Sequence, residues 1–253
     1  MDILTCPDYQ PTPALLKDRI ILVTGAGDGI GRAASHSFAA HGATVILAGR
    51  TLPKLEAVYD GIMAAGGPEP TLYPVDLDGA GEADYQTLAG AIEEQFGALN
   101  GLLHNAGELG QRTPIANYKA DTWEKVMKVN VTAQFLLTRA LLPVMEKASD
   151  ASILFTSSGV GRRGRAFWGA YAVSKFATEG LCQVLAQELE ETTRVRANCI
   201  NPGATRTRMR AAAYPGEDPR TLKTPEEIMP TYLFLMGPDS QGVSGKSFDA
   251  QPK

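Results

Sequence analysis

Short apolar runs alternate with longer segments of helical periodicity along almost the whole chain. The apolar runs, each predicted to form a β-strand, cover residues 19–24, 44–48, 71–75, 101–105, 151–156, 194–200 and 244–248. The segments predicted to form helices cover residues 30–41, 52–65, 84–96, 123–145, 171–190 and 225–235. Several of the strands read as continuous apolar runs, as strands buried on both faces do. The alternation therefore predicts an α/β fold, a doubly wound parallel sheet of about seven strands with helices on both faces.

Functional side chains of such a sheet are expected just after its strands. In doubly wound sheets the ligand crevice lies beyond the carboxyl ends of the strands, where the strand order reverses. The chain has 253 residues and shows no repeat, low-complexity block or Gly/Ser linker, so we expect residues 1–253 to form a single domain. Within that domain, the proline-containing residues 1–17 are expected to form an extended N-terminal arm.

Composition and charge narrow the classes of partner and compartment. Lysine and arginine number 24 against 28 acidic residues, and the net charge of −4 gives no reason to expect nucleic acid or an anionic membrane as a partner. The three cysteines form no disulfide framework, and the three histidines have no metal-ligand spacing. The sequence shows no signal-peptide pattern and no apolar run long enough to span a membrane. We therefore expect a cytoplasmic protein with no metal.

A glycine-rich turn follows the first predicted strand. Residues 24–31 read TGAGDGIG and lead into the first predicted helix. Glycines there allow a sharp turn, a close approach to a pyrophosphate and tight helix–strand packing, while the helix N-terminus attracts phosphate. A purely structural turn is the alternative, but the position between first strand and first helix is the one that a dinucleotide site requires. The predicted contacts are Gly25, Gly27, Asp28, Gly29, Ile30 and Gly31.

The end of the second predicted strand indicates which dinucleotide is preferred. Sites specific for NAD carry an acid there, about 20 residues after the glycine-rich turn, to bind the ribose 2′-hydroxyl. Gly49 stands in that place and leaves room for a phosphate, and Arg50 follows it. A guanidinium group can make charge-assisted, bidentate bonds to a 2′-phosphate. The sequence therefore favours NADP(H), with a solvated arginine at the start of a helix as the alternative for Arg50.

A tyrosine and a lysine begin the fifth predicted helix. Tyr171 and Lys175 are four residues apart and so lie on the same face. A free phenol, with a pKa of about 10, is a poor base at neutral pH. A neighbouring ammonium group lowers that pKa, which would suit Tyr171 to acid–base catalysis. Taken alone, the pair is more simply explained by a buried structural tyrosine beside a solvated lysine, so the assignment depends on the other motifs.

Several further motifs accompany these two in order along the chain. They are NAG at residues 105–107, Asn130, Ser158 and NPG at residues 201–203. With them, and over nearly its whole length, the sequence resembles the short-chain dehydrogenase/reductase family. Within that family it is most similar to the YciK-like bacterial oxidoreductases, through residues 104–107 (HNAG), 168–171 (WGAY), 174–180 (SKFATEG) and 248–252 (FDAQP).

The resemblance implies roles for four residues near the reacting bond. Tyr171 would be the proton donor in reduction and the base in oxidation, and Lys175 would lower its pKa and hold the nicotinamide ribose. Ser158, which precedes the tyrosine by 13 residues, would hydrogen-bond the substrate carbonyl. Ser157 is the competing candidate, but alternation along the strand turns it to the other side. Asn130 would hold a water that links Lys175 to solvent.

Cofactor contacts implied by the resemblance follow three other strands. Asp76 and Leu77 would meet the adenine, although an acid at the end of a strand is also common in turns. The remaining implied contacts lie at the adenine ribose and at the nicotinamide. The ribose would be lined by Asn105, Ala106 and Gly107, and the nicotinamide end would be held by Pro202, Gly203 and Thr207.

Two other sets of side chains fall outside this catalytic assignment. His104 stands where many members of the family have asparagine, and alternation points it away from Asn105, so we interpret it as a packing residue. Six arginines lie in the two segments expected to border the substrate, residues 159–168 and 205–225. They could attract an anionic substrate, but solvated or intersubunit arginines paired with acids are the preferred interpretation. They are Arg162, Arg163, Arg165, Arg206, Arg208 and Arg210.

The sequence thus predicts an NADP(H)-dependent oxidoreductase that transfers a hydride between NADPH and a carbonyl or alcohol substrate, with Tyr171 as general acid and base. A catalytically idle NADP(H)-binding sensor or scaffold on the same fold is the alternative. Enoyl reductases of the family usually space tyrosine and lysine more widely than this chain does. The resemblance also implies a homodimer or homotetramer that associates through residues 126–145 and 171–190, both apolar on more than one face.

Overall fold

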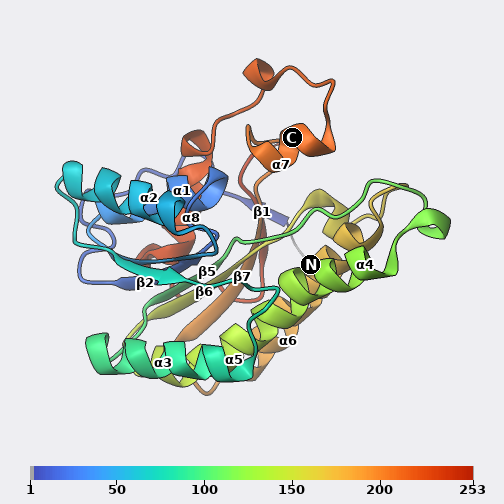
Figure 1. Cartoon of the computed structure of the whole chain (residues 1–253). Coiled ribbons are helices and arrows are strands. Elements are labelled where there is room, and N and C mark those ends of the chain that lie inside the picture. The colour runs from blue at the N-terminus through green and yellow to red at the C-terminus, as the bar shows by residue number, and fades with distance from the viewer. Residues whose placement is uncertain (1–2, 253) are drawn as a thin grey trace.

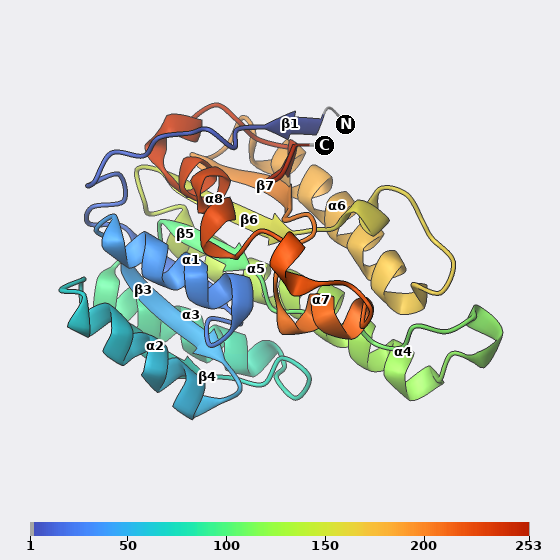
Figure 2. The same ribbon diagram turned by 90° about the horizontal axis from the view of Figure 1, so that it is seen from above.

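An eight-stranded parallel β-sheet runs through the middle of the molecule (Figures 1 and 2). The structure is a computed structural model and describes residues 3–252. Within these residues the strand order is β1-β8-β7-β6-β5-β2-β3-β4. The strands are β1 (Ile3–Thr5), β2 (Ile20–Thr24), β3 (Thr44–Gly49), β4 (Thr71–Pro74), β5 (Gly101–His104), β6 (Ala151–Thr156), β7 (Val195–Asn201) and β8 (Ser247–Asp249).

Helices cover both faces of this sheet, as Figures 1 and 2 show. One face carries α1 (Gly29–Ala40), α2 (Leu52–Ala64) and α8 (Met229–Met236). The other face carries α3 (Glu82–Phe96), α5 (Ala133–Met145) and α6 (Gly169–Leu189), with α4 (Ala120–Met127) continuing the line of α5. A short helix, α7 (Arg208–Ala213), lies beyond the carboxyl ends of the strands. The predicted α/β doubly wound parallel sheet is confirmed.

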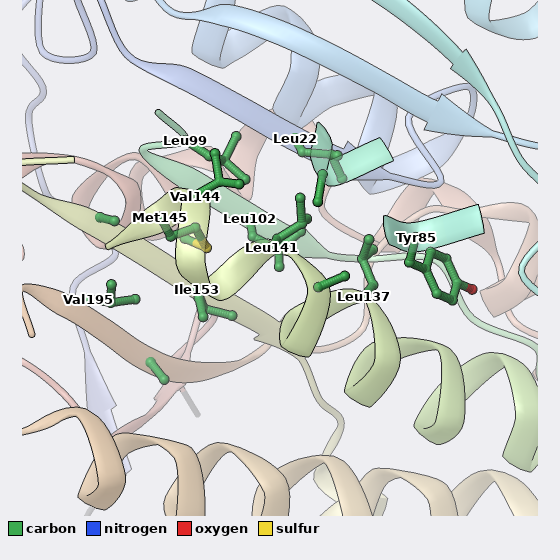
Figure 3. Close-up of a cluster of buried hydrophobic side chains, with 14 of the residues drawn as sticks. Leu22, Tyr85, Leu99, Leu102, Leu137, Leu141, Val144, Met145, Ile153 and Val195 are labelled. Atoms are coloured by element: carbon green, nitrogen blue, oxygen red, sulfur yellow. The ribbon is translucent and has the colours of Figure 1, made fainter. Parts of the chain in front are cut away.

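Two apolar clusters hold these layers together, one on each face of the sheet. Figure 3 shows the cluster on the α3, α5 and α6 side, where Leu102 and Ile153 of the sheet meet Leu141 of α5. On the opposite face, Phe38 of α1 and Tyr232 of α8 are completely buried. Continuous apolar strands such as β2 and β6 supply side chains to both clusters, which is why their sequences do not alternate.

The sheet has one strand more than the seven that the apolar pattern predicts. The additional strand, β1, lies within the expected N-terminal arm and pairs in parallel with β8 at the edge of the sheet. It has only three residues, all of them exposed, so its apolar run is too short to mark it as a strand in the sequence. The arm is also anchored further along, because the Tyr9 hydroxyl donates a hydrogen bond to Asp239 (2.6 Å) and Leu16 is fully buried.

Two helical segments differ from the predicted pattern. The single helix expected over residues 123–145 is divided into α4 and α5 by one turn of π-helix, Lys128–Thr132. A wide turn of this kind inserts one residue without breaking the apolar face, so periodicity does not reveal it. Within residues 205–225, α7 was not expected; it is only six residues long, and an isolated bridge between Thr205 and Lys223 closes the base of the segment.

Candidate active site

The strand order reverses at β2, and a cleft opens there at the carboxyl edge of the sheet. β2 pairs with β3 on one side and with β5 on the other, so the loops that follow these strands diverge. The cleft has a volume of about 680 Å³ and is lined by the turns that follow six of the strands and by α7. Doubly wound sheets bind their ligands at such a position.

The glycine-rich turn forms the floor of one end of this cleft. Gly25 has a positive φ of 68°, which a side chain would strain. At Gly31, an added Cβ would lie 2.2 Å from the Gly25 carbonyl oxygen, so only glycine allows α1 to approach the turn this closely. Asp28 caps α1 by accepting a hydrogen bond from the Gly29 N–H (2.8 Å), and the helix N-terminus faces the cleft.

Basic side chains surround the rim next to this turn. Arg50 follows β3, and its side chain is 62% exposed, with Nη1 3.7 Å from Glu108 Oε1. Lys54, from the first turn of α2, places Nζ 2.5 Å from Asp28 Oδ2, and this hydrogen bond lowers the pKa of the Asp28 carboxyl. Arg208 of α7 approaches the same carboxylate at 3.5 Å. The acid inside the glycine-rich turn is therefore neutralised by two cations.

The loops after β4 and β5 form the next part of the wall. Asp76 and Leu77 line the cleft, and Asp76 also accepts a hydrogen bond from the Asp78 N–H (3.2 Å), as a turn acid does. Thr24 Oγ1, at the end of β2, accepts hydrogen bonds from the N–H groups of Asn105 (3.0 Å) and Ala106 (3.1 Å). This contact fixes the loop that contains Gly107 beside the glycine-rich turn.

Tyr171 and Lys175 lie on one face of α6 at the other end of the cleft. Both are at least nine-tenths buried. Burial raises the pKa of the Tyr171 phenol to about 12, while the neighbouring Ser158 hydroxyl acts in the opposite direction. Burial lowers the pKa of Lys175 to about 8. Lys175 Nζ donates a hydrogen bond to the Thr156 carbonyl oxygen (2.7 Å) and lies 5.5 Å from the centre of the Tyr171 ring.

Asn130 is fully buried in the π-helical turn, behind this end of the cleft. Its Oδ1 accepts a hydrogen bond from the Glu108 N–H (2.8 Å), and its Nδ2 donates to the Glu108 carbonyl (2.9 Å) and to Ser174 Oγ (2.9 Å). Both N–H groups and the carbonyl oxygen of the side-chain amide therefore join the loop after β5 to α6.

The two serines that follow β6 face different environments, as strand alternation predicts. Ser158 lines the cleft beside Tyr171. Ser157 is buried and donates a hydrogen bond to Glu179 Oε1 (2.5 Å) on α6. Ser158 is thus the serine available to a ligand, and Ser157 anchors the end of the strand that carries it.

Arg162 points inward from the loop after Ser158 into a buried polar network. Its guanidinium group donates to Glu179 Oε1 (3.3 Å) and to Asp249 Oδ1 (2.6 Å), and it also bonds Ser247 Oγ. Asp249 Oδ1 accepts a further hydrogen bond from Asn201 Nδ2 (2.9 Å). The network therefore joins the serine loop, α6, β8 and the turn after β7.

The turn after β7 closes the cleft opposite the serine loop. Gly203 has a positive φ of 73°, and its N–H donates to Asn201 Oδ1 (3.1 Å). Thr207 caps α7 by accepting a hydrogen bond from the Arg210 N–H (3.1 Å), and its side chain faces Gly29. Pro202, Gly203 and Thr207 all line the cleft.

The structure brings almost all of the sequence-predicted residues to this one cleft. Gly31 and Asn130 do not line it, because both pack behind its wall. His104 is buried elsewhere, stacked on Phe155 with its Nε2 2.8 Å from Thr138 Oγ1, and burial lowers its pKa to about 3. The predicted residues that line the cleft are Gly25, Gly27, Asp28, Gly29, Ile30, Arg50, Asp76, Leu77, Asn105, Ala106, Gly107, Ser158, Tyr171, Lys175, Pro202, Gly203 and Thr207.

Several lining residues were not identified from the sequence. Lys54 and Glu108 lie on the rim beside Arg50, Leu109 packs against the cluster that contains Tyr171, and Met209 lines the cleft from α7. For Lys54 a signal exists, because a basic residue in the first turn of the helix after β3 faces the same edge as Arg50. Met209 belongs to α7, whose existence the sequence did not indicate.

The fold and the cleft agree with comparisons of the whole chain. Residues 19–218 match the model of the short chain dehydrogenase family. The chain therefore belongs to the short chain dehydrogenases and is an oxidoreductase of that family. It is 54% identical over 244 residues to the uncharacterized oxidoreductase YciK of Escherichia coli strain K12, and the match covers 96% of both chains.

Solved structures of similar proteins superpose closely on this chain. A short chain dehydrogenase from Pseudomonas syringae is 57% identical with a TM-score of 0.95, and the match covers 96% of this chain and 99% of that one. Another, from Escherichia coli CFT073, was solved in complex with NADPH. It is 55% identical with a TM-score of 0.93, covering 96% of this chain and all of that chain (100%). The expected resemblance to YciK-like oxidoreductases is confirmed.

Among residues 3–252, no helix has the length and apolar character needed to cross a membrane. The same residues contain no cluster of three or more histidine, cysteine or acidic side chains arranged to hold a metal ion.

Proposed function

We propose that this oxidoreductase transfers a hydride between NADPH and a carbonyl or alcohol substrate, with Tyr171 as general acid and base. The arrangement that carries the proposal is the convergence of Ser158, Tyr171 and Lys175 at one end of a cleft whose other end is the glycine-rich turn. A dinucleotide that rests its phosphates on the turn would extend along the cleft toward the tyrosine.

The residues along the cleft fit an NADP(H) cofactor. The close packing at Gly31, where a Cβ would meet the Gly25 carbonyl, holds the N-terminus of α1 against the turn, and a helix N-terminus attracts the phosphates of a dinucleotide. Gly49 supplies no acid to repel a 2′-phosphate, and Arg50 and Lys54 stand at the rim beside it. The NADPH found in the Escherichia coli CFT073 relative supports the same preference. Asp76 and Leu77 are assigned to the adenine, and residues 105–107 to its ribose.

Side chains of the protein would transfer the proton that the reaction requires. Bound NADPH supplies the hydride that reduces the carbonyl carbon. Tyr171 then gives its hydroxyl proton to the carbonyl oxygen, so that C=O becomes CH–OH, and the reverse reaction returns that proton to the phenolate. Burial keeps Tyr171 protonated at neutral pH, which is the state that reduction needs. Ser158 would donate a hydrogen bond to the same oxygen and orient it.

Lys175 and Asn130 are assigned to replacing the proton that Tyr171 releases. The hydrogen bond to the Thr156 carbonyl fixes the Lys175 ammonium one helical turn from Tyr171. A positive charge there favours the phenolate form and so eases proton release. Because both N–H groups of the Asn130 side chain are used by Glu108 and Ser174, we assign to a carbonyl oxygen of Asn130 the hydrogen bond from the water of the proton relay.

Two assignments concern the surroundings of the site. Residues 205–225, which leave the sheet at Thr205 and return at Lys223, are proposed to cover the substrate, because α7 within them lines the cleft. A homodimer or homotetramer is proposed to form through α5 and α6, where large apolar side chains remain exposed. These side chains are Phe135, Val173, Phe176 and Val184.

The proposed function is tested by following NADPH absorbance over a panel of aldehydes and ketones, with NADH in parallel. On a substrate that is reduced, Tyr171→Phe should lower kcat by at least ~10²-fold and leave NADPH affinity nearly unchanged, because only the transferable proton is lost. Tyr59→Phe, on α2 away from the cleft, is the matched control. NADPH binding without turnover of any carbonyl or alcohol would favour the idle sensor. Equal turnover with NADH would contradict the cofactor assignment.

A further inference from the structure

The end of the cleft beyond Tyr171 is built from apolar side chains. Leu109, Trp168 and Ala213 lie there with Tyr171, and Met209 and Ala212 of α7 add apolar side chains to the lining of the cleft. Trp168 and Ala213 belong to a buried cluster that also contains Val160 and Ala172, with Leu109 and Tyr214 packed against it. Ser158 and Tyr171 are the hydroxyl groups that reach this end, and the proposed function already assigns them to the carbonyl oxygen.

The arginines of this region do not offer free charge to a ligand. Arg210 is held by Glu217 through two hydrogen bonds of 2.6 Å, and Arg208 faces Asp28 on the cofactor side. Arg206 donates to the carbonyl oxygens of residues 219 and 222 within its own segment. Arg162 points into its buried network, and Arg163 and Arg165 do not line the cleft. A substrate carboxylate at this end would therefore lose water without gaining an arginine that is free of a carboxylate partner.

The apolar end is closed by a stack of arginines and aromatic rings. The Arg112 guanidinium carbon lies 4.3 Å from the ring centre of Trp168 and 5.1 Å from that of Tyr214. Arg210 lies 3.8 Å from the Tyr214 ring, and Arg112 Nη1 donates to the Ala213 carbonyl oxygen. We call Arg112, Trp168, Tyr214 and Arg210 the arginine–aromatic stack. It joins the loop after β5, the loop before α6 and the end of α7.

Arg112 fixes Trp168 without itself entering the cleft. It does not belong to the cleft lining, whereas Trp168 does, and the Trp168 ring also lies against Tyr171 at 5.7 Å between centres. Cations stacked on aromatic faces attract them electrostatically and restrict their orientation. The position of the indole wall relative to the reacting carbonyl is thus set from outside the site.

We propose that the substrate is an uncharged carbonyl compound with an apolar body, and that Trp168, held by Arg112, limits the length of that body. The inference rests on the proposed function, because it places the carbonyl at Tyr171. Arg112 is a positioning and specificity-determining residue in this scheme, since it acts through Trp168 and touches no substrate.

The substrate class is tested with paired aldehydes of similar shape, 4-isopropylbenzaldehyde and 4-formylbenzoate, at saturating NADPH. The neutral compound should have a kcat/KM at least ~10-fold higher, and the ratio should not change between low and high salt, because no exposed charge takes part. A preference for the carboxylate that weakens with salt would overturn the proposal.

The role of Arg112 is tested with aryl alkyl ketones of increasing chain length. In Arg112→Ala the KM of the longest ketones should fall several-fold relative to wild type, while kcat for the shortest changes less than about threefold. Arg163→Ala, an exposed arginine outside the cleft, is the control and should leave the series unchanged. Arg112→Lys, which keeps the charge but not the planar group, should restore part of the original length limit. A uniform loss over all chain lengths would show a merely structural role and overturn the assignment.

A binding measurement separates this inference from the proposed function. The chain has two tryptophans, so Trp123→Phe leaves Trp168 as the single indole reporter. Neutral aryl ketones and alcohols should quench its fluorescence in the presence of NADP⁺, and the carboxylates should not. Quenching without turnover would contradict the proposed reaction but support the assignment of this pocket to uncharged, apolar compounds. Turnover of carbonyls with no quenching by any neutral compound would overturn the pocket assignment and leave the reaction standing.

Discussion

At the scale of single residues, burial shifts the pKa values of Lys175 and Tyr171, two side chains near the serine loop, in opposite directions. Lys175 has a pKa lowered to about 8 from the ordinary 10.5, so the folded protein gives up this proton before the unfolded chain does. Stability therefore rises as the pH increases from 8 toward 10.5. Tyr171 has a pKa raised to about 12 from 10, so the unfolded chain ionises first and stability falls between pH 10 and 12.

Lys175→Met should remove the rise in stability that accompanies deprotonation of Lys175. Between pH 7 and pH 9.5, the wild-type free energy of unfolding should rise relative to that of the variant by up to roughly 2 kcal/mol, because the unfolded chain still holds most of this proton at pH 9.5. Urea unfolding at several pH values measures this difference. Lys119→Met, at an exposed lysine, is the control and should track the wild type. A constant difference between wild type and Lys175→Met over this range would contradict a lowered pKa.

Most of the residues that meet in the cleft could be predicted because they follow strands or share a helix face. The four-residue spacing put Tyr171 and Lys175 on one helix face, although their roles came from the other motifs and the family resemblance, and the glycine-rich turn was recognised by its place after β2. The pairing of Lys54 with Asp28 joins positions 26 apart in the sequence, and no local pattern encodes it. Arg112 likewise meets Trp168 and Tyr214 only because three separate loops converge.

At the scale of elements, the Arg162 network explains how strands and loops around the serine keep their relative positions. Side chains of Arg162, Glu179 and Asp249 are all largely buried, at 18%, 7% and 10% exposure. Removing the cation leaves two carboxylates with too few donors in a poorly solvated place. Because Ser157 bonds the same Glu179, the disturbance reaches Ser158 through the next peptide unit.

Arg162→Met should therefore destabilise the protein by about 3 kcal/mol and lower kcat more than it raises KM. Arg162→Lys keeps a charge but cannot reach all partners, so its effect on both quantities should be smaller. Arg163→Met, at the exposed neighbour, should change neither. Chemical denaturation and steady-state kinetics on the same preparations give both readouts. An Arg162→Met variant as stable and active as wild type would show that the network contributes nothing.

The sequence predicted strands and helices correctly where burial imposes a regular hydrophobic pattern, and it missed elements that have no such pattern. The interior strands β2, β3, β5, β6 and β7 are apolar because both faces are covered. β1 has three exposed residues, and α7 is one and a half turns long, so neither carries a usable period. The π-helical turn at Asn130 preserves the apolar face of the helix around it, so the hydrophobic pattern does not mark it. In the structure this turn is where the Asn130 side chain bonds the main chain of Glu108.

At the scale of the whole molecule, the N-terminal arm covers one edge of the sheet. β1 pairs with β8, and Tyr9 packs on Phe234 with ring centres 5.3 Å apart while its hydroxyl bonds Asp239. An uncovered edge strand exposes unpaired backbone groups that can pair with another chain. The arm therefore protects β8, which also carries Asp249 of the Arg162 network.

Deleting residues 2–10 should lower Tm while leaving the cleft intact, because none of the arm residues that the structure describes, 3–17, lines it. A loss of about 2 kcal/mol would lower Tm by roughly 4–8 °C in a chain of this size. Light scattering on heating should also begin earlier, since the β8 edge is open. Tyr9→Phe keeps the arm and removes one hydrogen bond, so its Tm should lie between those of the wild type and the deletion variant. An unchanged Tm and unchanged scattering in the deletion variant would mean that the arm adds no stability.

The pairing of β1 with β8 also sets an order of events during synthesis. Ile3 is made well before Ser247, its neighbour across the sheet edge. At ordinary rates of translation the arm must wait roughly 12–50 s for its partner strand to be made. The interior strands β2 to β7 precede β8 in the chain, so this edge closes only after β8 has been made. Until then, the arm and the unfinished edge are the surfaces through which two nascent chains could exchange strands.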